Sequence, residues 1–188
     1  MKCKPFIKKG LLLLALCFIP AQGMTGSGMS ISDEGYGRYT DETFHFTILI
    51  PSHWQKKSAD LSYKHILTLT RGQSHIRITA VIKDKTEVRK WQSIRDWYFH
   101  GIGKNLKSII ETREVVIHEK TRGRLYVMEF TTRKRTMLQR TLIAHRDNAI
   151  VVIECVATVK DFHRHRTLFN DVMGSLIFDG DDKVLKKG

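Results

Sequence analysis

The most constraining feature of this sequence is a short alternating segment that ends at a proline. Phenylalanine and isoleucine recur at every second position of residues 44–50, a pattern typical of a β-strand with one buried face. Pro51 has no N–H to donate to a sheet, so the strand should end there. Trp54 follows closely, and we expect its ring to close one end of the core. Most later elements are predicted as partners for this strand.

Length and composition favour a globular domain. The chain has 188 residues, enough for one domain with a sizeable core. Hydrophobic residues make up 41% of the chain and charged residues 27%, which differs from the composition of disordered chains. We expect a single domain at residues 36–178, preceded by a flexible Gly/Ser-rich leader at 24–35 and followed by a charged tail at 179–188.

The first 23 residues have the composition of a secretory signal peptide. Four lysines precede a short apolar run at residues 11–19, and small residues at 21–23 offer a cleavage site. The run is far shorter than the ~20 residues that span a bilayer. Cys17 raises the question of a lipid anchor, but a bulky residue among residues 14–16, where such signals have a small one, and the very short apolar run before Cys17 argue against it. We expect an exported protein, in the periplasm or outside the cell, with no transmembrane segment in its mature chain.

Charge and cysteine content narrow the partner classes. The chain carries 32 Lys and Arg against 19 Asp and Glu, a net charge of +13, and four of the lysines precede residue 24, which leaves +9 from Met24 onward. In an exported protein this charge favours an anionic polymer, a lipid head group or an acidic protein partner over nucleic acid. Cys155 is the one cysteine beyond the signal peptide, and its apolar surroundings predict a buried thiol, with a reactive or intermolecular thiol as the alternative.

Hydrophobic periodicity predicts the order β-ββ-α-ββββ-α. Short turns between consecutive strands indicate antiparallel pairing, and the most apolar strand, 149–158, should be central. For the last helix, Asp161 is the expected cap. The predicted strands lie at 44–50, 66–70, 75–83, 111–119, 125–132, 136–145 and 149–158, and the predicted helices at about 93–104 and 160–176.

Three segments together resemble the PsbP-like superfamily, which includes the PsbP subunit of photosystem II and the DcrB-type periplasmic proteins. The opening segment 44–54 is similar to the family's aromatic start with its Pro and Trp, and the meander 111–158 to its central sheet. Residues 172–178 are similar to its closing helix and strand. The resemblance implies an α+β fold, an α/β/α sandwich around a mostly antiparallel sheet of about six to seven strands. It also implies binding, assembly or scaffold roles without a shared catalytic motif.

The sequence contains few of the motifs that indicate catalysis or metal binding. The nucleophile-elbow motif, phosphate loop and dinucleotide fingerprint are absent. His163 and His165, two positions apart on a predicted helix, would not share a face, and His45 and His75 lie on separate segments. We therefore expect no enzyme, no cofactor and no metal site, although Ser52 lies beside a histidine on the predicted corner.

Basic clusters are the main functional lead. The function predicted first is an exported non-catalytic binding or envelope-support protein. The alternative is a secreted or surface-exposed protein that binds acidic host or matrix polymers. An ordinary solvated surface also explains such charges, and the two basic turns should lie at opposite ends of the sheet because one strand separates them. The candidate anion-binding residues are Lys120, Arg122 and Arg124 in one turn and Arg133, Lys134 and Arg135 in the other.

Overall fold

The computed structural model describes residues 35–58, 65–83, 91–102, 105–118, 121–132 and 135–179. The expected signal peptide, most of the leader and the tail beyond Asp179 lie outside these residues. The elements are β1 (Tyr36–Asp41), β2 (Phe46–Pro51), β3 (Gln55–Ser58), β4 (His65–Arg71), β5 (Ser74–Ile82), α2 (Trp91–Ile102), β6 (Leu106–His118), β7 (Thr121–Thr132), β8 (Arg135–Arg146), β9 (Ala149–Thr158), α3 (Val159–Arg164), α4 (Arg166–Gly174) and β10 (Ile177–Phe178).

A seven-stranded antiparallel sheet forms the centre of the fold, in the order β3-β4-β5-β9-β8-β7-β6. β9 lies in the middle, between β5 and β8, and nearly all of its residues are buried. Because a strand covered on both faces needs apolar residues at successive positions, the apolar run of β9 explains its place. The predicted antiparallel sheet and the central strand are confirmed.

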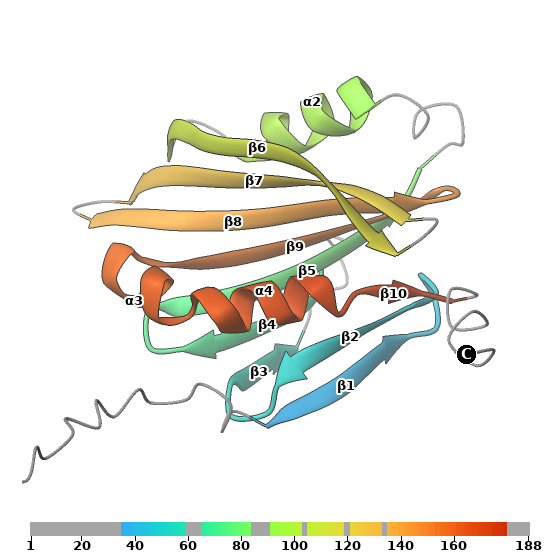
Figure 1. Ribbon diagram of the computed structural model, residues 1–188, viewed down its shortest axis with the longest axis horizontal. Coiled ribbons are helices and arrows are strands. Elements are labelled where there is room, and N and C mark those ends of the chain that lie inside the picture. Colours follow the sequence, from blue (N-terminus) through green and yellow to red (C-terminus); the bar gives the residue numbers. More distant parts are fainter. Residues whose placement is uncertain are drawn as a thin grey trace, which may run out of the picture. The chain divides into compact units, whose positions relative to one another are not determined.

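Each face of this sheet has its own apolar core, as expected for an α/β/α sandwich. Val151 and Ile153 of β9 pack with α3 and α4, and with the strands of a second sheet. Ile150 and Val152 face the other way and pack with Ile94 and other residues of α2. Figure 1 shows the two helix layers on either side of the strands. Among the described residues, the helices are too short or too polar for any of them to cross a membrane.

The opening strand lies in a separate sheet, which corrects one prediction. β2 pairs with β1 on one side and with the short β10 on the other, so it does not share a sheet with the later strands. Its residues Phe46 and Ile48 are completely buried against the α4 side of the main sheet. Trp54 is 4% exposed and contacts Phe169 edge to face at 6.3 Å, which confirms its expected place at one end of the core.

The last predicted helix is two helices. His165 interrupts the segment between α3 and α4. Thr158, rather than the expected Asp161, caps α3: its hydroxyl accepts from the Asp161 N–H and donates to the Asp161 carboxylate. This reciprocal pair resembles a capping box.

The first predicted helix corresponds to α2, with bounds that agree within a few residues. β6 begins at Leu106, earlier than predicted, because its register shifts disturb the period of two.

Candidate anion-binding site

The two basic turns predicted from the sequence lie at opposite ends of the β7–β8 hairpin. Arg122 is near the start of β7 and Arg135 at the start of β8, the antiparallel partner strand, and both are exposed. Lys120, Arg133 and Lys134 lie outside the described residues. The structure therefore does not bring Arg122 and Arg135 together, as expected, and anion binding at either turn stays a prediction.

Arg124, also predicted from the sequence as an anion-binding residue, already has interaction partners within the chain. Its Nη2 donates to Glu114 Oε1 at 3.0 Å, and its guanidinium lies 5.2 Å from the centroid of the Trp91 ring. The first contact joins β7 to β6, and the second joins β7 to α2 by a cation–π interaction. A structural role accounts for this arginine.

A different arginine, Arg140 in the middle of β8, is buried against α4 with 6% of its surface exposed. Its Nη1 donates to Oδ1 of Asn170 on α4, whereas its Nε has no hydrogen-bond partner within the described part of the chain. No carboxylate among the described residues forms an ion pair with it. Because a guanidinium stays charged in proteins and has five N–H donors, burial without a counter-ion is unfavourable. Arg140 is therefore well placed to receive an anion from outside the chain.

The charges around Arg140 are mostly positive. Burial lowers the pKa of its guanidinium, the Glu111 carboxylate acts to raise this pKa, and Arg113 and Arg166 lower it further. Glu111 is itself paired with Arg113, whose Nε lies 3.3 Å from Glu111 Oε1. The carboxylate that acts on Arg140 is thus already shared with another arginine. An anion bound here would be attracted by Arg140, Arg113 and Arg166 together.

An apolar groove of about 210 Å³ lies beside this cluster, between β6 and α4. We name it the Arg140 groove because two of its lining residues, Arg113 and Asn170, neighbour Arg140. The other lining residues are glycine or apolar: Val115, Val116, Ile117, Leu125, Leu142, Met173 and Gly174. Arg113 is the cationic residue of the described lining, and Arg140 contacts the lining residue Asn170. A cation at one part of an otherwise apolar groove suits a ligand with an anionic head and an apolar body.

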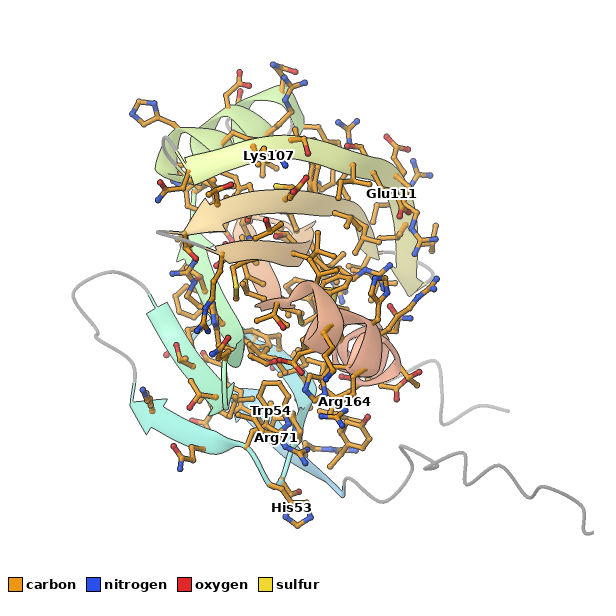
Figure 2. The ribbon with its side chains drawn as sticks, turned by 90° about the vertical axis from the view of Figure 1, so that its left-hand side faces the viewer. His53, Trp54, Arg71, Lys107, Glu111 and Arg164 are labelled. Atoms are coloured by element: carbon orange, nitrogen blue, oxygen red, sulfur yellow. The ribbon has the colours of Figure 1, made fainter. Side chains whose placement is uncertain are left out.

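The groove exists because β6 bends over the sheet. The pairing of β6 with β7 shifts register at three places, and such bulges bend a strand. Gly123 of β7 allows the close approach that follows: a Cβ there would lie 3.2 Å from Ile117 Cδ1 and 3.1 Å from Leu142 Cδ1. Figures 1 and 2 show β6 curving toward α4, with Glu111 labelled on the strand in Figure 2.

The opposite face of the sheet holds a buried carboxylate whose partners are all present. Glu154, 5% exposed, accepts hydrogen bonds at Oε1 from Tyr98 Oη at 2.9 Å and from Gln139 Nε2 at 3.0 Å. Its Oε2 accepts from Arg77 Nε at 2.5 Å. Burial and the Glu154 charge raise the pKa of Tyr98 well above its usual value, so this hydroxyl keeps the proton it donates. We interpret this network as the polar attachment of α2 to the sheet.

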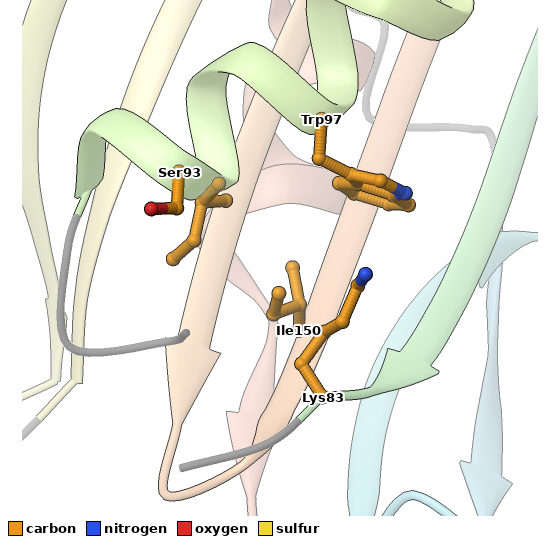
Figure 3. Close-up of a pocket in the computed structure, with 5 residues that line it drawn as sticks. Lys83, Ser93, Trp97 and Ile150 are labelled. Carbon is orange, nitrogen blue, oxygen red and sulfur yellow. The ribbon is translucent and has the colours of Figure 1, made fainter. Parts of the chain in front are cut away.

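A second pocket, also of about 210 Å³, lies under α2 (Figure 3). Ser93, Ile94 and Trp97 of α2 line it together with Lys83 and Ile150. The Lys83 ammonium lies 5.8 Å from the Trp97 ring centroid, a cation–π contact within the protein. Lys83 is the one charged residue of the described lining, and because it already has this aromatic contact, the pocket is a weaker candidate than the Arg140 groove.

The histidines singled out in the sequence lie apart. His163 is exposed, whereas His165 is buried with its ring 5.4 Å from that of Trp54. His45 lies in the β1–β2 turn and His75 in β5. Within the part of the chain that the structure describes, no three His, Cys, Asp or Glu side chains are grouped as metal ligands would be.

Cys155 is buried, as predicted, and burial raises the pKa of its thiol.

Sequence reasoning grouped Arg140 with the basic run at residues 133–135 but did not count it among the candidate anion-binding residues, although a signal for its burial was present. Arg140 lies between Leu138 and Leu142 at the spacing of one strand face, inside a segment predicted as a strand. A charge on the apolar face of an inner strand is unusual. That pattern predicts burial, but the absence of a carboxylate partner depends on how α4 and β6 pack, and no local pattern contains this information.

Comparisons with known proteins address the fold. The sequence matches no protein-family model and no curated protein. The solution structure of cyanobacterial PsbP (CyanoP) from Synechocystis sp. PCC 6803 matches with a TM-score of 0.63 at 9% identity, covering 83% of this chain and 99% of that chain. A crystal structure of a Bacteroides thetaiotaomicron protein matches with a TM-score of 0.54 at 11% identity, covering 79% of this chain and 50% of that chain. The chain therefore has a PsbP-like fold, which confirms the resemblance; at these identities the likeness concerns the fold and not the function.

Proposed function

We propose that this protein is an exported, non-catalytic binding protein that holds an anionic group of its partner at Arg140. The observation that carries the proposal is the buried guanidinium, which has one hydrogen bond to a neutral amide and an unpartnered Nε. An anion leaves water readily only for a site that supplies positive charge and directed donors. Arg140, with Arg113 and Arg166 close by, supplies both.

Two further features support this role. Residues 1–23 have the pattern of a signal peptide, and the net charge of +9 from Met24 onward favours an anionic partner. The polar groups that cluster around Glu154 use their donors and acceptors on one another, which suits a structural network better than a catalytic one. In this account the protein binds its partner without transforming it.

The test is thermal unfolding of the full chain with increasing sodium acetate, at constant ionic strength held with sodium chloride. Wild type, Arg140→Met and Arg135→Met are compared. An anion that binds the folded state raises Tm with its concentration. We expect this rise in wild type and in Arg135→Met, the exposed control on the same strand, and none in Arg140→Met.

Two outcomes would contradict the proposal. A Tm that does not depend on acetate in wild type means that Arg140 is not an anion site. A rise that Arg135→Met loses and Arg140→Met keeps would move the site to the basic β7–β8 turn, the residue set expected from the sequence, and would favour the alternative of binding to acidic polymers.

A further inference from the structure

We infer that the Arg140 groove takes an unbranched aliphatic carboxylate, whose head group replaces the Asn170 amide on Arg140 and whose chain lies along the apolar lining. This inference rests on the proposed function and names the chemical class of its ligand. The amide–guanidinium contact indicates the head group, and the lining and volume of the groove indicate the tail.

The head group is argued from Asn170. Its side chain is a planar amide on an exposed position of α4, and its Oδ1 accepts from Arg140 Nη1. A carboxylate has the same planar shape, carries the charge that the amide lacks, and accepts two parallel hydrogen bonds from a guanidinium. Because Asn170 is exposed, its side chain can turn into water without opening the core. A tetrahedral phosphate or sulfate does not match the planar shape of the displaced amide.

The tail is argued from the groove. Among the residues that the structure describes, its lining beyond Arg113 and Asn170 offers no polar side chain. At ~30 Å³ for a water-sized atom, a volume of about 210 Å³ accommodates about seven heavy atoms in one chain. A peptide terminus fits less well, because its backbone amides would lose water against Leu125, Leu142 and Met173 without gaining partners. The ligand is therefore a free aliphatic acid rather than a protein terminus.

The test is a chain-length series on the full-length protein, measured by isothermal titration calorimetry. The probes are acetate, butanoate, hexanoate and octanoate, with hexyl phosphate, hexyl sulfate and hexylamine as head-group controls. A short apolar peptide with a free C-terminal carboxylate is the control for a protein partner. Each buried methylene should tighten binding about threefold to fourfold, with the gain ending near the length that fills the groove. Hexylamine should not bind.

Matched variants separate the head from the tail. Val115→Thr keeps the side-chain shape and adds a hydroxyl to the groove lining, so it should weaken hexanoate binding several-fold and leave acetate binding unchanged. Val159→Thr makes the same change at an exposed position of α3 and should leave both unchanged. Arg140→Met should abolish binding of acetate and hexanoate alike.

The outcomes distinguish this inference from the proposed function. Arg140-dependent binding of acetate without any gain from chain length overturns the aliphatic ligand and leaves the anion site intact. Tighter binding of hexyl phosphate or hexyl sulfate than of hexanoate overturns the carboxylate, and tighter binding of the peptide overturns the free acid. No Arg140-dependent binding of any anion contradicts both proposals.

Discussion

Arg77 and Arg140 lie on opposite faces of one sheet and have opposite surroundings. The Arg77 side chain is 46% exposed and is nevertheless paired with the buried carboxylate of Glu154. Arg140 is 6% exposed as a residue and has no such partner among the described residues. The more deeply buried cation is the one without a counter-ion. Among the described residues, the buried carboxylate on the α2 face has its cation within the chain, whereas the buried guanidinium on the α4 face forms no ion pair, and we propose that a ligand supplies its counter-ion.

The largest expected effect comes from Arg77→Leu, which leaves Glu154 buried without its cation. Removing the cation from a buried carboxylate is destabilising, and because Arg77 is itself half-exposed we expect the free energy of unfolding to fall by about 2–3 kcal/mol, at or below the lower end of the range for fully buried pairs. Urea unfolding followed by circular dichroism measures this change. The double variant Arg77→Leu/Glu154→Leu should recover most of the loss, because it removes both charges. If Arg77→Leu alone changes stability by less than about 1 kcal/mol, the pair is not what holds this face together.

Tyr98→Phe should have the second largest effect. The Tyr98 hydroxyl lies between Glu154, Thr141 and Gln139, and losing a hydrogen bond to a charged group lowers stability by about 2 kcal/mol. Tyr126 provides a matched control on the same face, since its hydroxyl is buried without a partner. Tyr126→Phe should be neutral or stabilising in the same urea experiment. Equal losses in the two variants would show that the polar network contributes nothing specific.

Arg140→Met should change stability in the opposite direction to Arg77→Leu. It replaces a buried, uncompensated charge with an apolar side chain, and we expect a gain of about 1 kcal/mol in a buffer without organic anions. Arg135→Met, an exposed change on the same strand, should lie within about 0.5 kcal/mol of wild type. A clear loss of stability in Arg140→Met would mean that the chain itself already compensates this charge.

The smallest expected effect is a change in how the free energy of unfolding depends on pH, caused by a histidine on the α4 face. Burial lowers the pKa of His165, Arg71 and Arg164 lower it further, and Asp161 acts to raise it. The unfolded state therefore binds a proton near pH 6.5 before the folded state does, so stability falls as pH decreases below about 6.5. His75 and His145 have lowered pKa values as well. His165→Gln should reduce the slope of stability against pH without abolishing it, as measured by urea unfolding from neutral to mildly acidic pH. An unchanged slope would exclude His165 as a contributor.

The sequence predicted the parts of this structure that depend on local patterns. Alternation identified the buried residues Phe46 and Ile48, and the apolar run around Cys155 predicted a central strand. The partners of β2 could not be predicted, because β10 has only two residues and joins it from the far end of the chain. Hydrogen bonds between segments distant in sequence decide that pairing.

The candidate site shows the same limit more sharply. The conspicuous basic runs drew attention to the two ends of the β7–β8 hairpin, where Arg122 and Arg135 are exposed and far apart. Arg140 is flanked by polar residues in the sequence and attracts less notice, although strand alternation groups it with Leu138 and Leu142 on one strand face. Its missing counter-ion follows from the approach of Asn170 on α4 and from the bend of β6. Both are tertiary features.

The most direct test of the account is a double-mutant cycle between Asn170→Asp and Arg140→Met, measured as free energies of unfolding in a buffer without organic anions. If Arg140 lacks a counter-ion, an aspartate at position 170 supplies one within the chain. We therefore expect Asn170→Asp to be more favourable in wild type than in Arg140→Met by about 1.5–3 kcal/mol. The same variant should no longer respond to acetate, because the internal carboxylate occupies the site. An Asn170→Asp effect that is equal in both backgrounds would contradict the central claim that Arg140 is an uncompensated charge awaiting an anion.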